Sequence, residues 1–151
     1  MSLTLEIVTP ERRIFRGTTD SVIIPTTSGE IGILPGHVPL LTEVVAGEVR
    51  LANPGPNTSL PASHPDAAQP GPIRVAVDNG FARVLGDVVS ILTDAALDER
   101  KIDLQAAVDA QARAEKALAE ARDKKLDPAE IQQLEAIARF AIVQQLMKKK
   151  N

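Results

Sequence analysis

The hydrophobic pattern of this 151-residue chain changes its period once, near Asp98. Upstream of that point, short runs of Val, Ile and Leu are bounded by Gly, Pro and Asn, which is typical of β-strands. Downstream, apolar residues recur every three or four positions, as they do on one face of a helix. Because the two patterns need separate cores, the sequence predicts a β-unit over residues 1–96 and a helical unit over residues 97–151.

The β-unit is predicted from short apolar runs that are separated by turn residues. Asn79-Gly80 lies between two such runs and predicts a hairpin, and Gly86-Asp87 predicts a second turn. Many short strands with regular turns are typical of an antiparallel β-sandwich or flattened barrel, so the predicted fold class is α+β. The predicted strands are residues 3–8, 21–25, 73–77, 81–85 and 88–92, with two more candidates around Gly47 within residues 41–51.

Residues 29–42 carry three glycines and two prolines among β-branched residues and leucines. Glycine supplies backbone angles that other residues resist, and proline fixes φ and removes a hydrogen-bond donor. The central Pro-Gly-His-Val-Pro at residues 35–39 therefore cannot be a regular helix or a central strand. We predict an ordered, irregular corner.

Residues 53–72 interrupt the strand pattern with six prolines and two glycines. Such a segment cannot bury enough apolar area to offset the entropy of ordering it. We predict a flexible loop between paired strands. A tolerated surface insertion and a docking motif both remain open.

The helical unit is predicted to be an antiparallel hairpin of two helices, each of about 20 residues and roughly 30 Å long. Asp127 suits the N-cap of the second helix, Pro128 its first position and Glu130 a capping box. The shared face of the first helix is largely alanine, so the hairpin is expected to be weakly held. A movable element and a simple close-packed interface both fit this face. The predicted inward positions are Leu104, Ala107, Val108, Ala114, Ala117, Leu118 and Ala121 in the first helix, and Ile131, Leu134, Ala138, Ala141 and Ile142 in the second.

Composition excludes several function classes. A net charge of -3 and an aromatic content of 2% argue against nucleic-acid binding. Without cysteine there are no thiolate nucleophiles and no cysteine-based zinc sites. For His37, packing or hydrogen bonding is favoured over metal binding, and His64 lies in the predicted flexible loop, so no metal site is expected. No nucleophile elbow, phosphate loop or HExxH motif occurs, so we expect no catalytic residues and no independent enzyme.

The sequence also predicts how the chain relates to membranes. Met1 leads directly into a strand-like run, so no secretory signal is expected. No apolar run approaches the roughly 20 residues that a helix needs to span a bilayer. Any membrane association is therefore expected to come through a partner, without direct insertion.

The block at residues 29–41, the Val-Ala-Val-Asp-Asn-Gly-Phe run at residues 75–81 and the alanine-rich helical tail together resemble the ε subunit of bacterial F-type ATP synthases. The resemblance implies a non-catalytic rotor subunit of the central stalk. Such a subunit links γ to the c ring, supports the coupling of proton translocation to ATP synthesis, and inhibits ATP hydrolysis through its C-terminal helices. The resemblance also implies a peripheral location, as part of F1, on the cytoplasmic face of the bacterial inner membrane.

The same resemblance implies roles for individual residues. Ser28, Glu30 and His37 would lie on the side that faces the c ring and γ. Extended helices would insert between α, β and γ, where cations face an acidic segment of β. The cations concerned are Arg113, Lys116, Arg122 and Arg139. Interleaved acidic residues leave an ordinary solvated helix surface as the alternative.

Some bacterial members of that family bind ATP through an Ile-Asp-x-x-Arg-Ala motif at the start of the first C-terminal helix. Here Ile102 and Asp103 are retained, but Ala106 stands at the arginine position. The planar donor suited to phosphate is thus lost. We therefore predict no cofactor and regard ATP binding as doubtful, with an N-cap as the alternative role for Asp103.

Two other hypotheses compete with the rotor subunit. One is a freestanding β-sandwich that binds a ligand and dimerises through its helical hairpin. The other, a small hydrolase using Asp and Glu, lacks any paired-carboxylate motif. Co-purification separates the first two, because a rotor subunit predicts a stoichiometric complex with γ and the alternative predicts a homodimer.

The isolated chain is expected to bind ATP weakly or not at all, because Ala106 cannot donate hydrogen bonds from its side chain to phosphate. Calorimetric titration with ATP measures this directly. Saturable binding at micromolar ATP would contradict the prediction and would mean that another arginine, such as Arg100 or Arg113, supplies the contact.

Overall fold

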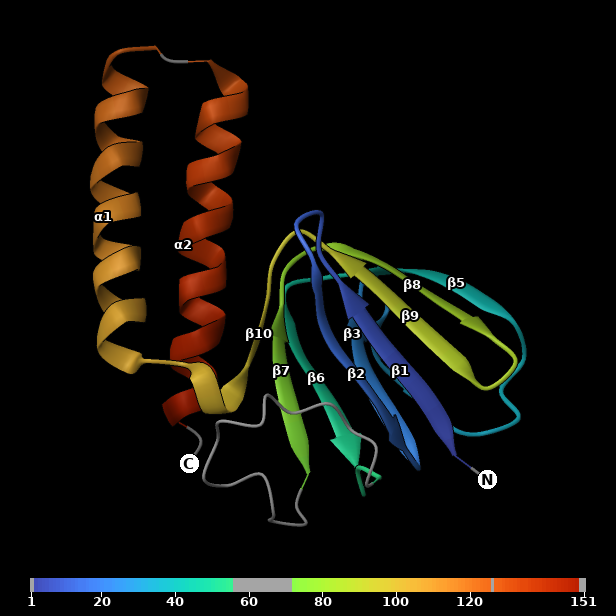
Figure 1. Ribbon diagram of the computed structural model, residues 1–151. Helices are drawn as coiled ribbons and strands as arrows, with labels where there is room; N and C mark the ends of the chain where they lie inside the picture. Colours follow the sequence, from blue (N-terminus) through green and yellow to red (C-terminus); the bar gives the residue numbers. More distant parts are fainter. Residues whose placement is uncertain (1, 56–71, 126, 150–151) are drawn as a thin grey trace. The chain divides into compact units, whose positions relative to one another are not determined.

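The computed structural model describes residues 2–55, 72–125 and 127–149. The chain divides into two units, one ending at Asp98 and the other beginning at Glu99, and each is described by itself (Figure 1). Most of the predicted loop insertion, residues 56–71, lies outside the described residues.

The first unit is a β-sandwich, or flattened barrel, as the sequence predicts (Figure 1). The strands run in the order β10-β7-β6-β3-β5-β8-β9-β1-β2, and β4 pairs with β3. Neighbours are antiparallel except β1 and β9, a parallel pair that strand periodicity could not predict. Within the described residues the ten strands are β1 (Leu3–Val8), β2 (Arg13–Thr19), β3 (Ser21–Thr26), β4 (Gly29–Ile33), β5 (Leu40–Val44), β6 (Gly47–Ala52), β7 (Ile73–Val77), β8 (Gly80–Leu85), β9 (Val88–Thr93) and β10 (Ala96–Asp98).

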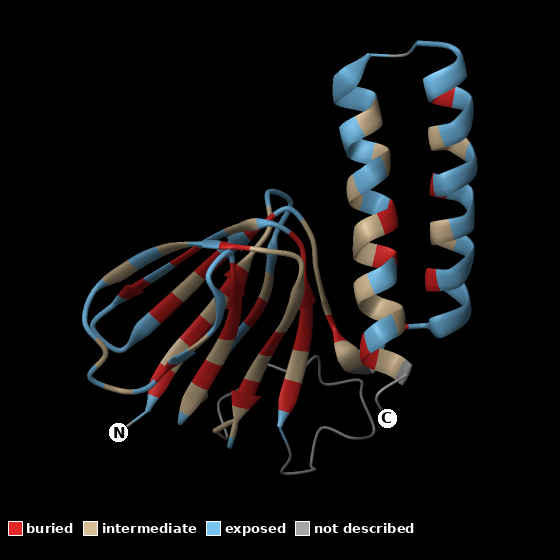
Figure 2. Cartoon of the chain, turned by 180° about the vertical axis from the view of Figure 1, so that it is seen from behind, coloured by how far each residue is buried: buried red, intermediate tan, exposed pale blue. Residues whose placement is uncertain are grey.

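The core of the sandwich consists of the inward positions of these strands. Buried and less buried residues alternate along β1 and β6, so one face of each strand packs inside (Figure 2). The core is mostly aliphatic, as the low aromatic content requires, and Phe15 is its aromatic member. β6 and β7, the strands on either side of the insertion, pair from Gly47 with Val77 to Leu51 with Ile73, as predicted.

The predicted hairpin at Asn79-Gly80 is wrong. β7 pairs with β6 and β10, whereas β8 pairs with β5 and β9. A two-residue type I′ turn needs positive φ at both central residues, and neither Asn79 nor Gly80 has it. Hydrogen bonds instead fasten this segment elsewhere: Asp78 N–H donates to Ala95 O (2.9 Å), and Ala46 N–H donates to Asn79 Oδ1 (3.0 Å). The segment is a crossing between two regions of the sheet.

The other predicted turn is confirmed. Leu85 and Val88 pair across the Gly86–Asp87 connection, and Gly86 has a φ of 60°, which glycine adopts without strain. The predicted irregular corner lies between β4 and β5. In it, Gly36 has a φ of 84° and His37 N–H donates to Leu34 O (3.1 Å).

The second unit comprises the short helix η1 (Glu99–Lys101) and the helices α1 (Leu104–Asp123) and α2 (Pro128–Lys149), which form the predicted hairpin (Figure 1). Asp127 caps α2 as predicted, because its Oδ1 accepts from Ala129 N–H (3.0 Å). None of the described helices is long and apolar enough to span a bilayer.

The interface of the hairpin is narrower than predicted. Ala107, Ala114 and Ala121 are buried in α1, and Ala138, Ala141 and Met147 in α2. We call the three α1 alanines and the two α2 alanines the alanine seam. Small side chains let the helices approach closely, so positions beside the seam turn outward. Leu104, Val108 and Ile142, which were predicted to point inward, are therefore 40–41% exposed.

Replacing Gly80 with alanine is expected to lower the free energy of unfolding by about 2 kcal/mol or more. A Cβ at this position would overlap the backbone oxygen of Leu92, which cannot shift without disturbing the β8–β9 pairing. Urea unfolding of the full chain measures the change. Gly32→Ala is the control, because a Cβ there meets no atom within 4 Å. Equal losses in the two variants would contradict the close approach at Gly80.

Candidate functional site

The outer surface of β8 and β9 is largely apolar, although Arg83 and Ser90 lie opposite each other at its centre. An antiparallel sheet usually faces water with polar residues. Phe81 lies opposite Leu92 and Leu85 opposite Val88, and these side chains are 44–58% exposed. Leu41, on the neighbouring strand β5, is 71% exposed. We call these five residues the apolar face. Clusters of this kind commonly mark interaction sites.

The inward positions of the same strands are also apolar. Ala82, Val84, Val89 and Ile91 are buried in the core, so β8 and β9 carry apolar residues on both sides. Sequence reasoning did not identify this surface. The sequence pattern that could have indicated it is the run Val-Val-Ser-Ile-Leu at residues 88–92, in which one serine is the only polar residue. Such a run predicts a strand that is covered on both faces.

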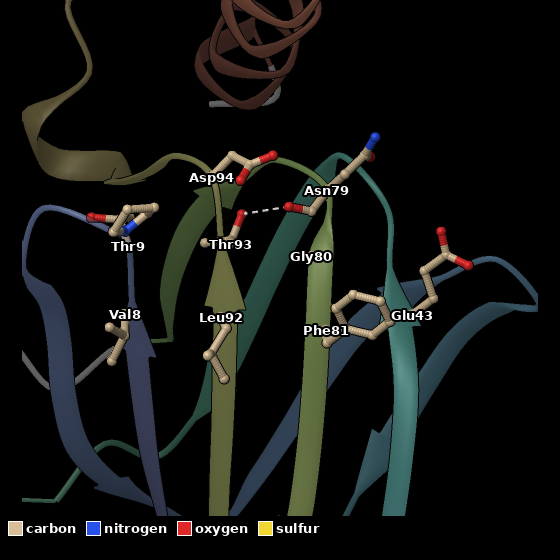
Figure 3. Close-up of a pocket in the computed structure, with 10 residues that line it drawn as sticks. Val8, Thr9, Glu43, Asn79, Gly80, Phe81, Leu92, Thr93 and Asp94 are labelled. Carbon is tan, nitrogen blue, oxygen red and sulfur yellow. Dashed lines mark hydrogen bonds between the residues drawn. The ribbon is translucent and has the colours of Figure 1, made fainter.

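A groove of about 510 Å³ lies at the end of the apolar face (Figure 3). Phe81, Leu92 and Val8 contribute apolar walls, and the acidic residues Glu43 and Asp94 also line it. Beneath it, Thr93 Oγ1 donates to Asp78 O (2.8 Å) and lies 3.2 Å from Asn79 O. The groove is therefore built on the crossing between β7 and β8.

The corner that contains His37 adjoins the other end of the apolar face. Gly36 N–H donates to Asp87 Oδ1 (3.3 Å), which ties the corner to the turn between β8 and β9. His37 is half-buried, and its Nδ1 lies 2.7 Å from Val38 O. Leu34 and Val38 in this corner are 62% and 69% exposed, so they extend the apolar surface beyond the strands.

Ser28 and Glu30 lie at the opposite end of β4 from His37. Ser28 occupies the β3–β4 turn, where its N–H donates to Thr26 Oγ1 (3.2 Å). Glu30 is the second residue of β4, and the corner with His37 follows the end of that strand. The structure thus places the three residues predicted to face γ and the c ring at two separate positions.

Glu30 belongs to a chain of alternating charges that we call the ion ladder: Glu30, Arg50, Glu48 and Arg74. Arg50 Nη2 lies 2.7 Å from Glu30 Oε2 and its Nη1 lies 3.1 Å from Glu48 Oε1, while Arg74 Nη1 lies 3.6 Å from Glu48 Oε2. The hydrogen bond with Glu48 is the main cause that raises the pKa of Arg50. Burial lowers the pKa of Arg50 in part, and the hydrogen bond with Glu30 raises it further.

The four cations that were predicted to act in inhibition do not form one patch. Arg113 precedes the seam residue Ala114 and Arg122 follows Ala121, so the two lie on opposite flanks of the seam. Lys116 is exposed on α1, and Arg139 is half-buried on α2. Arg122 pairs across the hairpin with Glu135 at 3.7 Å.

Asp103 acts as the N-cap of α1. Its Oδ1 accepts from Ala106 N–H (3.2 Å), and its backbone is extended, as a cap requires. Ile102 beside it is buried. Within the described ranges, no cluster of three His, Cys, Asp or Glu side chains is placed to hold a metal ion.

Comparison with known proteins gives a consistent result. The family model for the ATP synthase, Delta/Epsilon chain, beta-sandwich domain matches residues 2–61. The ATP synthase epsilon chain of Nitrosococcus oceani is 37% identical over 151 residues, which cover 99% of this chain and 97% of the relative. The ATP synthase epsilon chain 2 of Ralstonia nicotianae is 34% identical over 151 residues, with coverage of 99% and 98%.

A similar fold occurs in a solved structure. A chain in the OSCP/F1/c-ring structure of the Euglena gracilis mitochondrial ATP synthase matches with a TM-score of 0.58 and 22% identity. The match covers 99% of this chain and 82% of that chain. It supports the two-part fold.

Proposed function

The chain belongs to the family of ATP synthase epsilon chains, and we propose on this basis that it is a non-catalytic rotor subunit in the central stalk of an F-type ATP synthase. In this role it links γ to the c ring and supports the coupling of proton translocation to ATP synthesis. It lies at the cytoplasmic face of the bacterial inner membrane as a peripheral part of F1.

The apolar face is the observation that carries this proposal. Phe81, Leu85, Val88, Leu92 and Leu41 form a surface that a partner can cover, and the corner with Leu34 and Val38 extends it. Burial of apolar surface is the main favourable contribution to most protein–protein association. We assign this surface to γ, with His37 at one edge. The freestanding, dimeric ligand-binding protein lacks comparable support, because the full-length relatives are epsilon chains.

The other end of β4 is assigned to the c ring. Ser28 is exposed in the β3–β4 turn, and the Glu30 side chain is 54% exposed beside it. Polar groups on a turn can contact polar loops of a membrane ring without entering the bilayer. With γ on the apolar face and the ring at this turn, the sandwich would transmit torque between them.

The helical hairpin is assigned to the inhibition of ATP hydrolysis. Apart from Met147, its buried helix residues are alanines, whose methyl groups contribute less per residue than leucine side chains, so separating α1 from α2 costs comparatively little. Opened helices would present Arg113, Lys116, Arg122 and Arg139 to the acidic segment of β between α, β and γ. Their positions around the hairpin suit a helix that is surrounded by several partners.

Introducing Glu at Phe81 is expected to weaken γ binding by about 30-fold or more, which corresponds to the loss of one interface hot spot. A charge there would have to be desolvated against an apolar partner. Calorimetric titration of the full chain with γ measures the effect. Arg16→Glu, which adds the same carboxylate on β2 outside the apolar face, is the control. Wild-type affinity in Phe81→Glu would place the γ interface elsewhere.

Removing the residues after Asp98, or reversing Arg113, Lys116, Arg122 and Arg139 to glutamate, is expected to raise ATP hydrolysis by the assembled enzyme. Cations held in a partly water-excluded cleft interact strongly with an acidic surface, and reversal makes the contact repulsive. Steady-state hydrolysis rates measure the change, with Arg12, Arg13 and Arg16 reversed together as the control. An unchanged rate in both tail variants would show that the hairpin is not the inhibitory element.

A further inference from the structure

We propose that Arg50 is a positioning residue, which holds the carboxylate of Glu30 in the orientation that meets the c ring. This inference rests on the proposed role of Glu30 at the ring. It adds a residue that sequence reasoning did not select, because Arg50 is 20 positions away from Glu30 in the chain.

Sheet pairing brings the two residues together. β4 and β6 both pair with β3, where Pro25 is opposite Glu30 and Ile23 is opposite Arg50. The Arg50 side chain reaches across β3 and donates from Nη2 to Glu30 Oε2 at 2.7 Å. This distance is typical of a charge-assisted hydrogen bond.

Glu48 fixes the other side of the guanidinium. Arg50 Nη1 donates to Glu48 Oε1 at 3.1 Å, so two nitrogens of one planar group are held by two different carboxylates. Arg50 also lies directly opposite Arg74 on β7, and Glu48 approaches both cations. Glu48 therefore offsets the repulsion between the two arginines and leaves Arg50 oriented toward β4.

Exposure is low at the inner pair of the ion ladder and rises from Glu48 through Arg50 to Glu30. The side chains of Glu48 and Arg74 are 10% and 16% exposed, that of Arg50 is 34% exposed, and that of Glu30 is 54% exposed. The ladder is thus anchored near the sheet and ends on its most exposed member. An exposed glutamate normally loses rotamer freedom when a partner binds, and Arg50 has already restricted Glu30 before binding.

The arrangement leaves one oxygen of Glu30 for the ring. Oε2 is taken by Arg50, and within the described ranges Oε1 accepts no hydrogen bond. A hydrogen-bond donor on a polar loop of the ring would then meet a carboxylate of fixed orientation. If the ion ladder only stabilised the sheet, substitutions in it would not change binding to the ring.

The test measures binding of the complex of γ with the full-length chain to detergent-purified c ring by biolayer interferometry. The variants are Glu30→Gln, Arg50→Ala, Arg50→Lys and the double variant Glu30→Gln with Arg50→Ala. Arg13→Ala is the matched control, because it removes an arginine from another ion pair on the sandwich, with Glu6 at 3.5 Å. Thermal midpoints of the isolated chains confirm that each variant is folded.

We expect Glu30→Gln and Arg50→Ala each to weaken ring binding between about threefold and tenfold, which is the range for one typical hydrogen bond. Arg50→Lys should recover part of the loss, because an ammonium keeps the charge but not the planar fork. The double variant should bind no more weakly than Glu30→Gln, and Arg13→Ala should bind as the wild type does.

Other results would overturn the inference in distinguishable ways. Weakened binding in Glu30→Gln together with wild-type binding in Arg50→Ala would remove Arg50 from the contact and leave the ring-facing role of Glu30 intact. Additive losses in the double variant would show that Arg50 acts independently of Glu30. Wild-type binding in Glu30→Gln would overturn the proposed ring contact itself, and the role of Arg50 with it.

Discussion

The hydroxyl group of Thr93 stabilises the crossing of the chain from β7 to β8 through hydrogen bonds. It accepts from Asp78 N–H (3.1 Å) and donates to Asp78 O (2.8 Å), while Gly80 allows the backbone of β8 to pass close to Leu92. Because of this crossing, β8 pairs with β5 and β9 instead of returning along β7. The strands that carry the apolar face, and the groove at its end, both depend on it.

The two units differ in how strongly their interiors are held. The sandwich buries Leu, Ile and Val side chains from strands that are far apart in sequence, so its core is lost only when many pairings break together. The hairpin depends on small alanine contacts, with the 2.6 Å hydrogen bond from Gln145 to Gln111 joining its helices. Local opening is expected first where buried apolar area is least. A rigid sandwich and a more easily opened hairpin can thus coexist in one chain.

Features that depend on nearby residues could be predicted from the sequence: the strand periodicity, the corner around Gly36, the turn at Gly86 and the cap at Asp127. Features that depend on distant pairing could not. Asn79-Gly80 fits a hairpin locally, but hydrogen bonds to Ala95 and Ala46 prevail. The order of the strands in the sheet determines that Phe81 is exposed and that Arg50 pairs with Glu30. Periodicity along the sequence does not reveal this order. The assigned partners of Ser28, Glu30 and His37 remain predictions.

The apolar face has a further consequence for the chain before assembly. Residues 88–92 form an uncharged run with an exposed apolar side, and such segments tend to associate with one another when nothing covers them. Newly made copies without a partner would therefore be recognised by chaperones and proteases. If a partner covers the apolar face, as proposed, a cell would be expected to match the supply of this chain to that of the partner, and the same surface would limit the lifetime of surplus protein.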